Sequence, residues 1–213
     1  MKAIAIATVN NICLPVLIKS IDQYVPKDVA IFIAGATYDI PDRKMYCFEN
    51  SRETFGEAYN FIANKAFEHF DEIIVVNDDI VFNPTTYPLL KEDVEHLKKT
   101  CRLGWVVSKS DRVRGSQQFF NSPPNAIYEV PVASPLCGYI SKSSWIDFPP
   151  INWYSDDIQC IDMAKNGCKH FVSRSYVHHV GSQTIGADDH KNHLEAEPWI
   201  KQNRKELHLE WFK

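Results

Sequence analysis

Residues 71–83 read DEIIVVNDDIVFN, and this stretch decides the fold. Its apolar run, Ile73–Val76, stops abruptly at Asn77, Asp78 and Asp79 before apolar residues resume. Four successive apolar residues are typical of a strand that is buried on both faces, as in the parallel sheet of an α/β protein. Open α/β sheets bind their ligands at the carboxyl ends of such strands. The two carboxylates are therefore expected at a ligand site.

Adjacent acids repel each other unless a cation or hydrogen-bond donors compensate them. A divalent metal bound by oxygen ligands and a diphosphate is one arrangement that satisfies this requirement. The alternative is a strand that simply ends in a turn, where Asn and Asp are common without any chemistry.

Around this stretch the pattern alternates between strand and helix. This alternation predicts a parallel sheet with right-handed crossovers. The expected strands are Lys2–Ala7, Val29–Ala34, Lys44–Phe48, Gly104–Ser108, Tyr128–Val132, Cys137–Ile140 and His170–Val177. Helices are expected from Leu14 to near Pro26, from Phe55 to Phe70 with Ser51 or Thr54 as the cap, from Leu90 to Cys101 and from Ser155, as N-cap, to Gly167. We expect one domain over residues 1–213.

Composition excludes several classes of protein. The 213 residues are 45% hydrophobic and 23% charged, and the formal net charge of −4 argues against a broad basic surface for nucleic acid. Six scattered cysteines without a CxxC pair indicate reduced thiols. The polar residues of 8–11 interrupt the first apolar run too early for a signal peptide. No stretch reaches the roughly 18 apolar residues of a membrane span, so a cytoplasmic protein is expected.

Two further groups of polar residues carry candidate chemistry. Asp156 and Asp157 lie in the first turn of a predicted helix, where the helix dipole favours negative charge even without a function. As a functional pair, one of them would remove a proton from an attacking hydroxyl. His178 and His179 end a predicted strand and would be either ordinary surface residues or metal ligands. Acids at one strand end, acids at a helix start and histidines at another strand end suit a metal-assisted transfer reaction.

Five loose motifs follow one another along the chain: ATVNN (7–11), FGEAYNFIANKAF (55–67), IIVVNDDIVF (73–82), YSDDIQCIDMAKNG (154–167) and VHHVGSQT (177–184). In these motifs, and in their order, the chain resembles GT-A fold glycosyltransferases, specifically the inverting, family 2-like group, over nearly its whole length. IIVVNDDIVF corresponds to the strand with the family's DXD-type motif, and CGYISKSSW (137–145) is similar to the acceptor-side strand. The resemblance implies a single GT-A (Rossmann-like) α/β domain with a mostly parallel central sheet flanked by helices. Residues 1–83 would form the nucleotide-sugar-binding half, and residues 84–213 the acceptor-side half and the tail.

The resemblance also implies roles for single residues. Asp79 and His179 would hold Mn²⁺ or Mg²⁺, and Asp157, or Asp156 as the second choice, would be the catalytic base. The residues expected to contact the nucleotide sugar, with a UDP-sugar favoured, are Thr8, Asn10, Asp39, Asn60, Asn77 and Asp78.

Two positions depart from the family pattern. Strand 29–34 runs into IAGATYD instead of the usual D-D-G-S-T-D, so Asp39 is the substitute for the base-contacting acid. Asn77 replaces an acid, which predicts modest metal affinity that depends on the sugar nucleotide.

The expected activity is metal-dependent, inverting transfer of a sugar from a nucleoside-diphosphate sugar to a hydroxyl. The acceptor would be a saccharide, a protein or a hydroxymethylated DNA base of a phage, and residues 111–125 would form a lid. For the DNA acceptor, a local basic patch is expected from Lys109, Arg112, Arg114 and Lys142. The alternatives are a nucleotidyltransferase or sugar-nucleotide pyrophosphorylase and a non-catalytic sugar-nucleotide-binding module. The first is disfavoured because loop 8–15 has neither the glycine nor the basic residue that a triphosphate requires.

Overall fold

The apolar run of residues 73–76 forms the inner part of strand β4 (Glu72–Asn77). All four side chains are fully buried, because β4 lies inside the sheet between β1 (Ala3–Ala7) and β8 (Cys137–Ser141). Burying one such side chain contributes about 1.5–3 kcal/mol to folding. A computed structural model describes residues 1–9, 12–123, 125–180 and 189–212 of the chain.

The nine-stranded sheet has the order β3-β2-β1-β4-β8-β6-β9-β5, and β7 pairs with β9 beside this path. The remaining strands are β2 (Ala30–Ala34), β3 (Met45–Phe48), β5 (Ile80–Val81), β6 (Leu103–Ser110), β7 (Tyr128–Val130) and β9 (Lys169–His179). Strands β1, β2, β3, β4, β6 and β9 run in one direction, while β5, β7 and β8 run against them. The sheet is therefore mostly parallel in strand direction, which confirms the predicted fold class.

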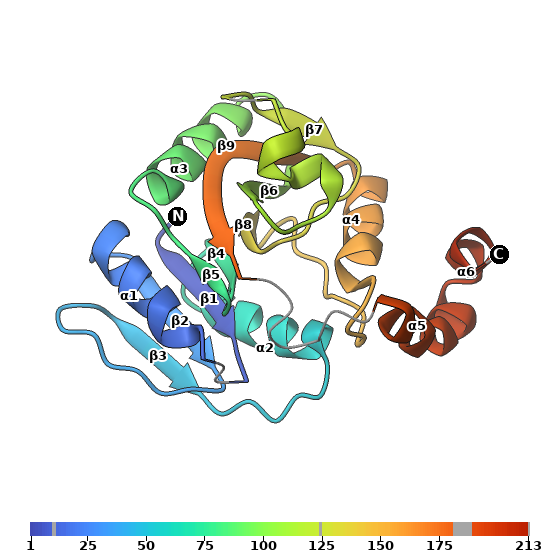
Figure 1. The fold of residues 1–213 in the computed structure, drawn as a ribbon, viewed down its shortest axis with the longest axis horizontal. Coiled ribbons are helices and arrows are strands. Elements are labelled where there is room, and N and C mark those ends of the chain that lie inside the picture. The colour runs from blue at the N-terminus through green and yellow to red at the C-terminus, as the bar shows by residue number, and fades with distance from the viewer. Residues whose placement is uncertain (10–11, 124, 181–188, 213) are drawn as a thin grey trace.

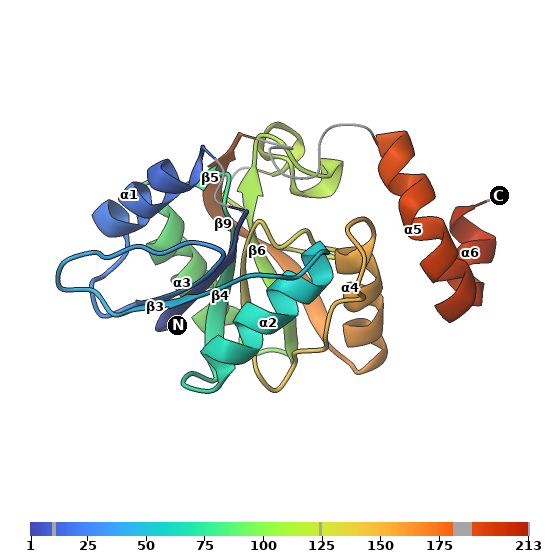
Figure 2. The ribbon, with the colours of Figure 1, turned by 90° about the horizontal axis from the view of Figure 1, so that it is seen from below.

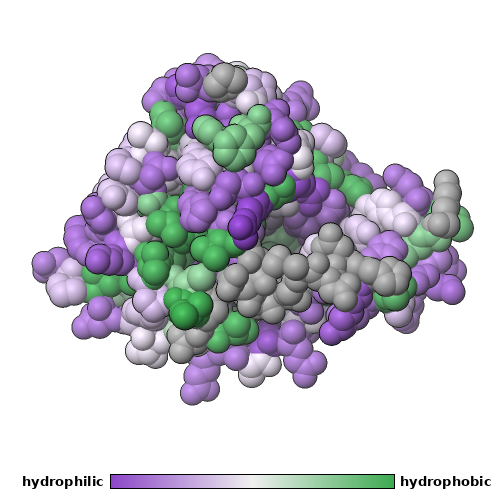
Figure 3. All heavy atoms as spheres, viewed as in Figure 1, coloured by the Kyte–Doolittle hydropathy of each residue, from purple (hydrophilic) through white to green (hydrophobic). Residues whose placement is uncertain are grey.

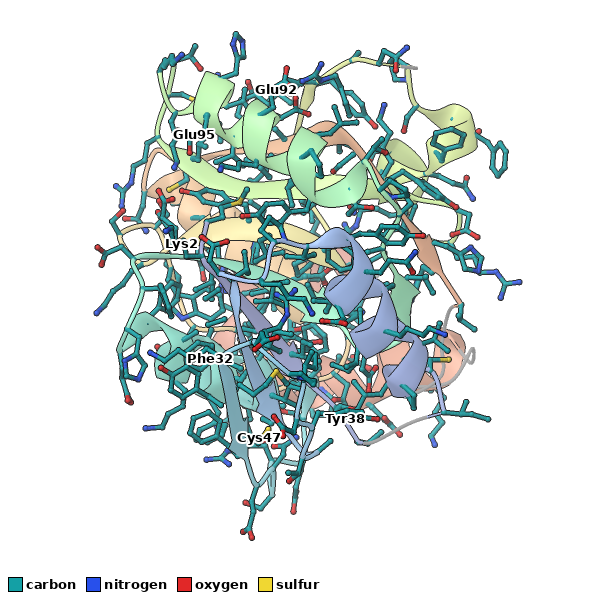
Figure 4. All side chains as sticks on the ribbon, turned by 90° about the vertical axis from the view of Figure 1, so that its left-hand side faces the viewer. Lys2, Phe32, Tyr38, Cys47, Glu92 and Glu95 are labelled. Carbon is teal, nitrogen blue, oxygen red and sulfur yellow. The ribbon has the colours of Figure 1, made fainter. Side chains whose placement is uncertain are left out.

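Helices cover both faces of this sheet (Figures 1 and 2). The helices α1 (Leu14–Tyr24) and α3 (Thr86–Leu97) bury their apolar stripes against one face, together with the isoleucines of β1 and β2. The helices α2 (Phe55–Phe67) and α4 (Ser155–Lys165) cover the other face, against the alanines of β1 and Phe32. Figure 4 looks onto the side of α1 and α3, where Glu92 and Glu95 project from the outer surface of α3.

Every predicted strand and helix of this layered core is found, with ends that differ by a few residues. Thr54 is the N-cap of α2 and forms a reciprocal capping box with Glu57. Ser155 was expected to be the N-cap of α4, and this prediction is wrong. Tyr154 holds that position with a φ of 66°, in the left-handed region, and makes no side-chain capping bond. An aromatic residue rarely adopts this conformation, so the preceding chain must enter α4 through a sharp turn.

The C-terminal residues form α5 (Asp189–Asn203) and α6 (Lys205–Trp211), which pack beside α4 (Figure 1). Ile200 and Leu207 are buried there against Ile158, and Arg204 pairs with Asp162 at 2.8 Å. Trp199, Trp211 and Phe212 pack against the same cluster, whereas Leu209 is 69% exposed. Among the described residues, we find no helix whose length and apolar content would let it span a membrane.

A close backbone contact joins the start of α2 to the segment that leads into α4. The amide of Gly56 donates to the carbonyl of Ile151, and the amide of Phe55 donates to the Asn152 side chain at 2.8 Å. A Cβ atom on Gly56 would lie 1.8 Å from the carbonyl oxygen of Pro149. Only glycine fits at this position without movement of one backbone segment.

We therefore expect Gly56→Ala to lower the free energy of unfolding by about 1–3 kcal/mol, as overpacking does, although alanine favours helices. Gly115→Ala is the matched control, because a Cβ atom there meets nothing within 4 Å. That variant should change stability by at most about 1 kcal/mol. Chemical denaturation of both variants tests the contact, and equal stabilities would contradict it.

Candidate active site

A cleft of about 1080 Å³ opens at the carboxyl ends of β1 and β4. Both acid pairs and His179 line it, as do residues of loop 111–118 and the first residues of α2 and α4. Figure 3 shows the molecule hollowed near the middle of the face turned to the viewer, with hydrophilic and hydrophobic side chains beside the hollow. The sheet therefore brings together segments that lie about 100 residues apart in the sequence.

The turn after β4 is held from several sides. The amide of Asn77 donates to the Leu136 carbonyl at 2.9 Å, and the Tyr59 hydroxyl lies 3.2 Å from Oδ1 of Asn77. Asp78 is buried, and its Oδ2 accepts a 2.6 Å hydrogen bond from the Thr8 hydroxyl at the end of β1. Burial and the charges of Asp78 and Asp79 raise the pKa of Tyr59 well above its usual value, so its hydroxyl remains a donor.

Asp79 and His179 form a pair in the cleft. Strand β5 pairs antiparallel with β9, with Ile80 opposite His179, so the residue before β5 is brought beside the end of β9. Nε2 of His179 lies 3.2 Å from both carboxylate oxygens of Asp79. Burial lowers the pKa of His179, but the hydrogen bond and charge of Asp79, the Arg112 carbonyl and the charge of Asp111 together raise it above its usual value.

The hydrogen bond of Nδ1 determines which nitrogen of the His179 ring is protonated. Nδ1 lies within hydrogen-bond distance of the Arg112 carbonyl, which can only accept, so Nδ1 carries the proton. Nε2 faces the Asp79 carboxylate, which also can only accept, so Nε2 donates to Asp79 when the ring is protonated. In the neutral ring its lone pair becomes available to a metal. The backbone amide of His179 also donates to Asp111 at 2.9 Å. His178 instead pairs with Asp111 at 2.8 Å and is 53% exposed, so His179 is the histidine at Asp79.

The second acid pair is compensated by an arginine. Arg114 contacts Asp157 through two nitrogens, at 2.9 and 3.1 Å, and contacts Oδ2 of Asp156 at 2.9 Å. The Ser134 hydroxyl also donates to Asp156 at 2.9 Å. Burial raises the pKa of Asp156 to about 6; the charge of Asp157 adds to this rise, and Arg114 opposes it.

Several residues expected at the site lie elsewhere. Asn60 exchanges two hydrogen bonds with the backbone of Phe148, at 2.9 and 2.8 Å, and does not line the cleft. Asp39 is exposed in the segment between β2 and β3, also away from the cleft lining. Asn10 lies outside the described residues. Direct contact of these three with a nucleotide sugar stays a prediction.

The predicted basic patch does not form. The Lys109 side chain is buried and donates to the Pro123 carbonyl, and Lys142 donates to the Phe67 carbonyl at the opposite end of β4. Arg114 is neutralised by the two aspartates, which leaves Arg112 on this wall of the cleft. These residues are separated because Lys109 points into the core from β6, whereas Lys142 follows the far end of β8.

The sequence placed Arg114 in the predicted basic patch, whereas the structure places it beside Asp156 and Asp157. No role at the site was predicted for Asp111 or Tyr59. Both arginine and aspartate lie in loop 111–125, which has no periodicity to place them. This loop forms one wall of the cleft and contains two short 3₁₀ turns, η1 (Gly115–Gln117) and η2 (Phe119–Asn121). A detectable signal was the content of the loop: two arginines and one aspartate in four residues of an otherwise uncharged stretch.

The donor set at Asp79 fits a hard divalent cation. It supplies a carboxylate and an imidazole nitrogen with its tautomer set, and Mg²⁺-type sites commonly complete their shell with substrate phosphates and water. Within the described residues, no group of three or more His, Cys, Asp or Glu side chains could hold a metal by itself. A cation here would therefore depend on oxygens from a ligand.

Solved structures share this fold. S. aureus TarS (residues 1–349) with UDP-GlcNAc superposes with a TM-score of 0.64 at 16% identity, over 98% of this chain and 69% of that chain. GalNAc-T7 with UDP, GalNAc and Mn²⁺ superposes with a TM-score of 0.67 at 14% identity, over 88% of this chain and 44% of that chain. No family model and no curated protein matches the sequence. Both structures are GT-A glycosyltransferases, so the chain has the predicted GT-A fold.

Thr8→Val tests how the buried acid at position 78 is held. We expect a loss of about 1.5–3 kcal/mol in the free energy of unfolding, because the substitution removes a hydrogen bond to a buried carboxylate without changing the side-chain shape. Thr8→Ser keeps the hydroxyl and should be clearly more stable than Thr8→Val. If the two variants are equally stable in chemical denaturation, the hydroxyl does not hold Asp78.

Proposed function

We propose that the chain is a metal-dependent, inverting glycosyltransferase that moves a sugar from a nucleoside-diphosphate sugar to a hydroxyl. One observation carries this proposal: the Asp79–His179 pair and the Asp156–Asp157 pair line the same cleft at the carboxyl edge of a GT-A sheet. The first pair suits a diphosphate with a divalent cation, and the second pair suits a proton acceptor for the incoming hydroxyl.

Asp79 and His179 would hold the cation, Mn²⁺ or Mg²⁺. When bound, such an ion neutralises the charge that develops on the diphosphate as it leaves. Burial of the Asp79 carboxylate makes this pairing favourable, because a buried acid gains most from a nearby cation. The neutral imidazole of His179 adds a nitrogen ligand whose orientation the Arg112 carbonyl maintains.

The donor would occupy the side of the cleft formed by the ends of β1 and β4. Thr8, Asn77 and Asp78 line the cleft there and remain the proposed contacts of the nucleotide sugar. UDP-sugars are the favoured donors, since UDP and UDP-GlcNAc are bound in the similar TarS structures and UDP in that of GalNAc-T7.

The reaction would be a single displacement. Asp157 accepts the proton of the acceptor hydroxyl, and the hydroxyl oxygen forms a bond to the anomeric carbon. The bond from that carbon to the diphosphate breaks on the opposite face, and its electron pair leaves with the nucleotide. The product sugar is therefore inverted at the anomeric carbon.

The acceptor is proposed only as a hydroxyl compound, either a saccharide or a protein side chain. A hydroxymethylated DNA base is the weakest of the three candidates, because the four basic residues expected to contact DNA are dispersed. A pyrophosphorylase would instead form nucleotide sugar from a nucleoside triphosphate and a sugar phosphate. A binding module would bind the donor without turnover.

Asp79→Asn should abolish metal-dependent binding of UDP while leaving the protein folded, because the substitution removes the charge that attracts the cation but preserves the side-chain shape. The measurement is a thermal-shift panel of UDP, other nucleoside diphosphates and UDP-sugars with Mn²⁺, Mg²⁺ or EDTA. Ligand at 100 times its Kd stabilises a fold by about 2.7 kcal/mol, which is readily observed.

Asp71→Asn is the matched control for this panel, since Asp71 is exposed at the opposite end of β4. It should keep the metal-dependent shift of the unmodified protein. If no nucleoside diphosphate stabilises the unmodified protein with either metal, the proposed donor site is wrong.

Asp157→Asn should lower the rate of sugar transfer about 10²- to 10⁴-fold, the usual contribution of a general base. Binding of UDP with Mn²⁺ should stay within the range of the unmodified protein, because the acid lies on the acceptor side. Product analysis by NMR of the anomeric proton checks inversion at the same time. Retention of the anomeric configuration would exclude the single displacement.

A further inference from the structure

Arg114 makes the densest set of ionic contacts in the cleft. Its Nη1 and Nη2 bind Oδ1 and Oδ2 of Asp157 as a fork, at 2.9 and 3.1 Å. Nη2 also bonds to Asp156, and Nε donates to the Ser134 hydroxyl at 2.7 Å. The guanidinium side chain is 28% exposed, so water screens these contacts only in part.

Asp156 and Asp157 differ in how many further hydrogen bonds their carboxylate oxygens can accept. A carboxylate offers about four lone-pair positions to hydrogen-bond donors. Asp156 accepts three bonds among the described residues, from Arg114, the Ser134 hydroxyl and the backbone amide of Asp157. Asp157 accepts two bonds there, both from Arg114. Asp157 can thus accept a further hydrogen bond from a substrate hydroxyl, whereas Asp156 is nearly saturated.

The loop that carries Arg114 is fixed to the core by a buried side chain. The side-chain nitrogen Nε2 of Gln117 donates to the carbonyls of Ser108 and Ser134, both at 2.9 Å. Its side-chain oxygen accepts a hydrogen bond from the backbone amide of Ser134 at 3.0 Å. Gln117 is 1% exposed, so these bonds are shielded from water. Ser134 also contacts Arg114 and Asp156, so one residue links the loop anchor to the acid pair.

We propose that Arg114 is a positioning residue for the catalytic base: its fork orients the Asp157 carboxylate and compensates the charge of the adjacent aspartates. This arrangement gives the base role to Asp157 and a supporting role to Asp156. The proposal rests on the proposed function. Arg114 acts through Asp157 and takes no part in the displacement itself, in which the hydroxyl proton passes to Asp157.

The electrostatic reason is the proximity of the two acids. Nη2 of Arg114 bonds to a carboxylate oxygen of each, so the two negative charges lie close together. Without the arginine, one of the two would retain a proton to a higher pH, as in other close carboxyl pairs. Among the described residues, Tyr154, which precedes α4, and Cys160, on the same helix, also interact electrostatically with Asp157. Burial raises the pKa of both, so they stay neutral and leave Arg114 as the compensating charge.

The first test is a double-variant cycle in chemical denaturation, which needs no activity. Arg114→Gln, Asp157→Asn and the combined variant are compared with the unmodified protein. If the fork exists in solution, Asp157→Asn should cost less stability in the Arg114→Gln background. The deviation from additivity is expected to be about 2- to 100-fold in the unfolding equilibrium constant. Strict additivity would overturn the proposal.

The second test is the pH profile of kcat/KM for sugar transfer. Arg114→Gln should move its acidic limb upward, since the variant removes the positive charge that the two close carboxylates share, and one of a close carboxyl pair then holds a proton to a higher pH. UDP affinity with Mn²⁺ should stay unchanged, and Arg114→Lys, which keeps the charge but loses the fork, should show an intermediate limb. Arg102→Gln is the control, because Arg102 bonds to the carbonyls of Asn166 and Ser143 and, within the part of the chain that the structure describes, to no carboxylate.

Three results would overturn the assignment. A rate that falls equally at every pH, without movement of the limb, would leave Arg114 a merely structural residue. A loss of UDP affinity that accounts for the loss of kcat/KM would make it a donor-binding residue. If the unmodified protein transfers no sugar, the proposed function fails and the base assignment fails with it. The stability cycle would then still report whether the Arg114–Asp157 pair exists, which separates the two failures.

Discussion

The cleft is organised by one electrostatic constraint: two pairs of adjacent aspartates, at positions 78 and 79 and at positions 156 and 157, line it together. Carboxylates removed from water are costly unless each is paired or hydrogen-bonded. The structure meets this requirement with a different partner for each site. Thr8 donates to Asp78, His179 faces Asp79, and Arg114 spans the second pair. Each partner comes from a different strand end or loop, so the fold must be complete before the acids are compensated.

The topology explains how these partners meet. The ends of β1 and β4 are neighbours because the two strands are parallel and in register from Ile4 opposite Ile74 to Ala7 opposite Asn77. Thr8 and Asp78 therefore follow their strands at the same height. His179 is placed by a different strand pairing, since the short β5, which follows Asp79, pairs antiparallel with the end of β9. The antiparallel part of the sheet is thus what brings the histidine to the acids of the parallel part.

The sequence predicted this framework well because its signals are local. The run Ile73–Val76 predicted a buried strand. The strand ends indicated that the acids and the histidines could meet at one site, while the choice of Asp79 and His179 came from the family resemblance. Asn60 was less predictable, because a polar residue on a helix gives no sign of whether it faces a ligand or a neighbouring backbone. Tyr154 was also missed, since no sequence pattern favours a left-handed aromatic at an N-cap. Arg114 lies in a loop without periodicity, where contacts depend on tertiary structure alone.

Loop 111–125 connects the two halves of the site. Within four residues, Asp111 accepts the amide of His179, the Arg112 carbonyl holds its imidazole, and Arg114 holds Asp157. The imidazole at the proposed metal site and the carboxylate at the proposed base thus depend on the same short segment of backbone. Gln117 and Lys109 anchor that segment to β6 through buried hydrogen bonds. A displacement of the loop would therefore change both groups together, so the proposed donor binding and the proposed proton acceptance would depend on one structural element.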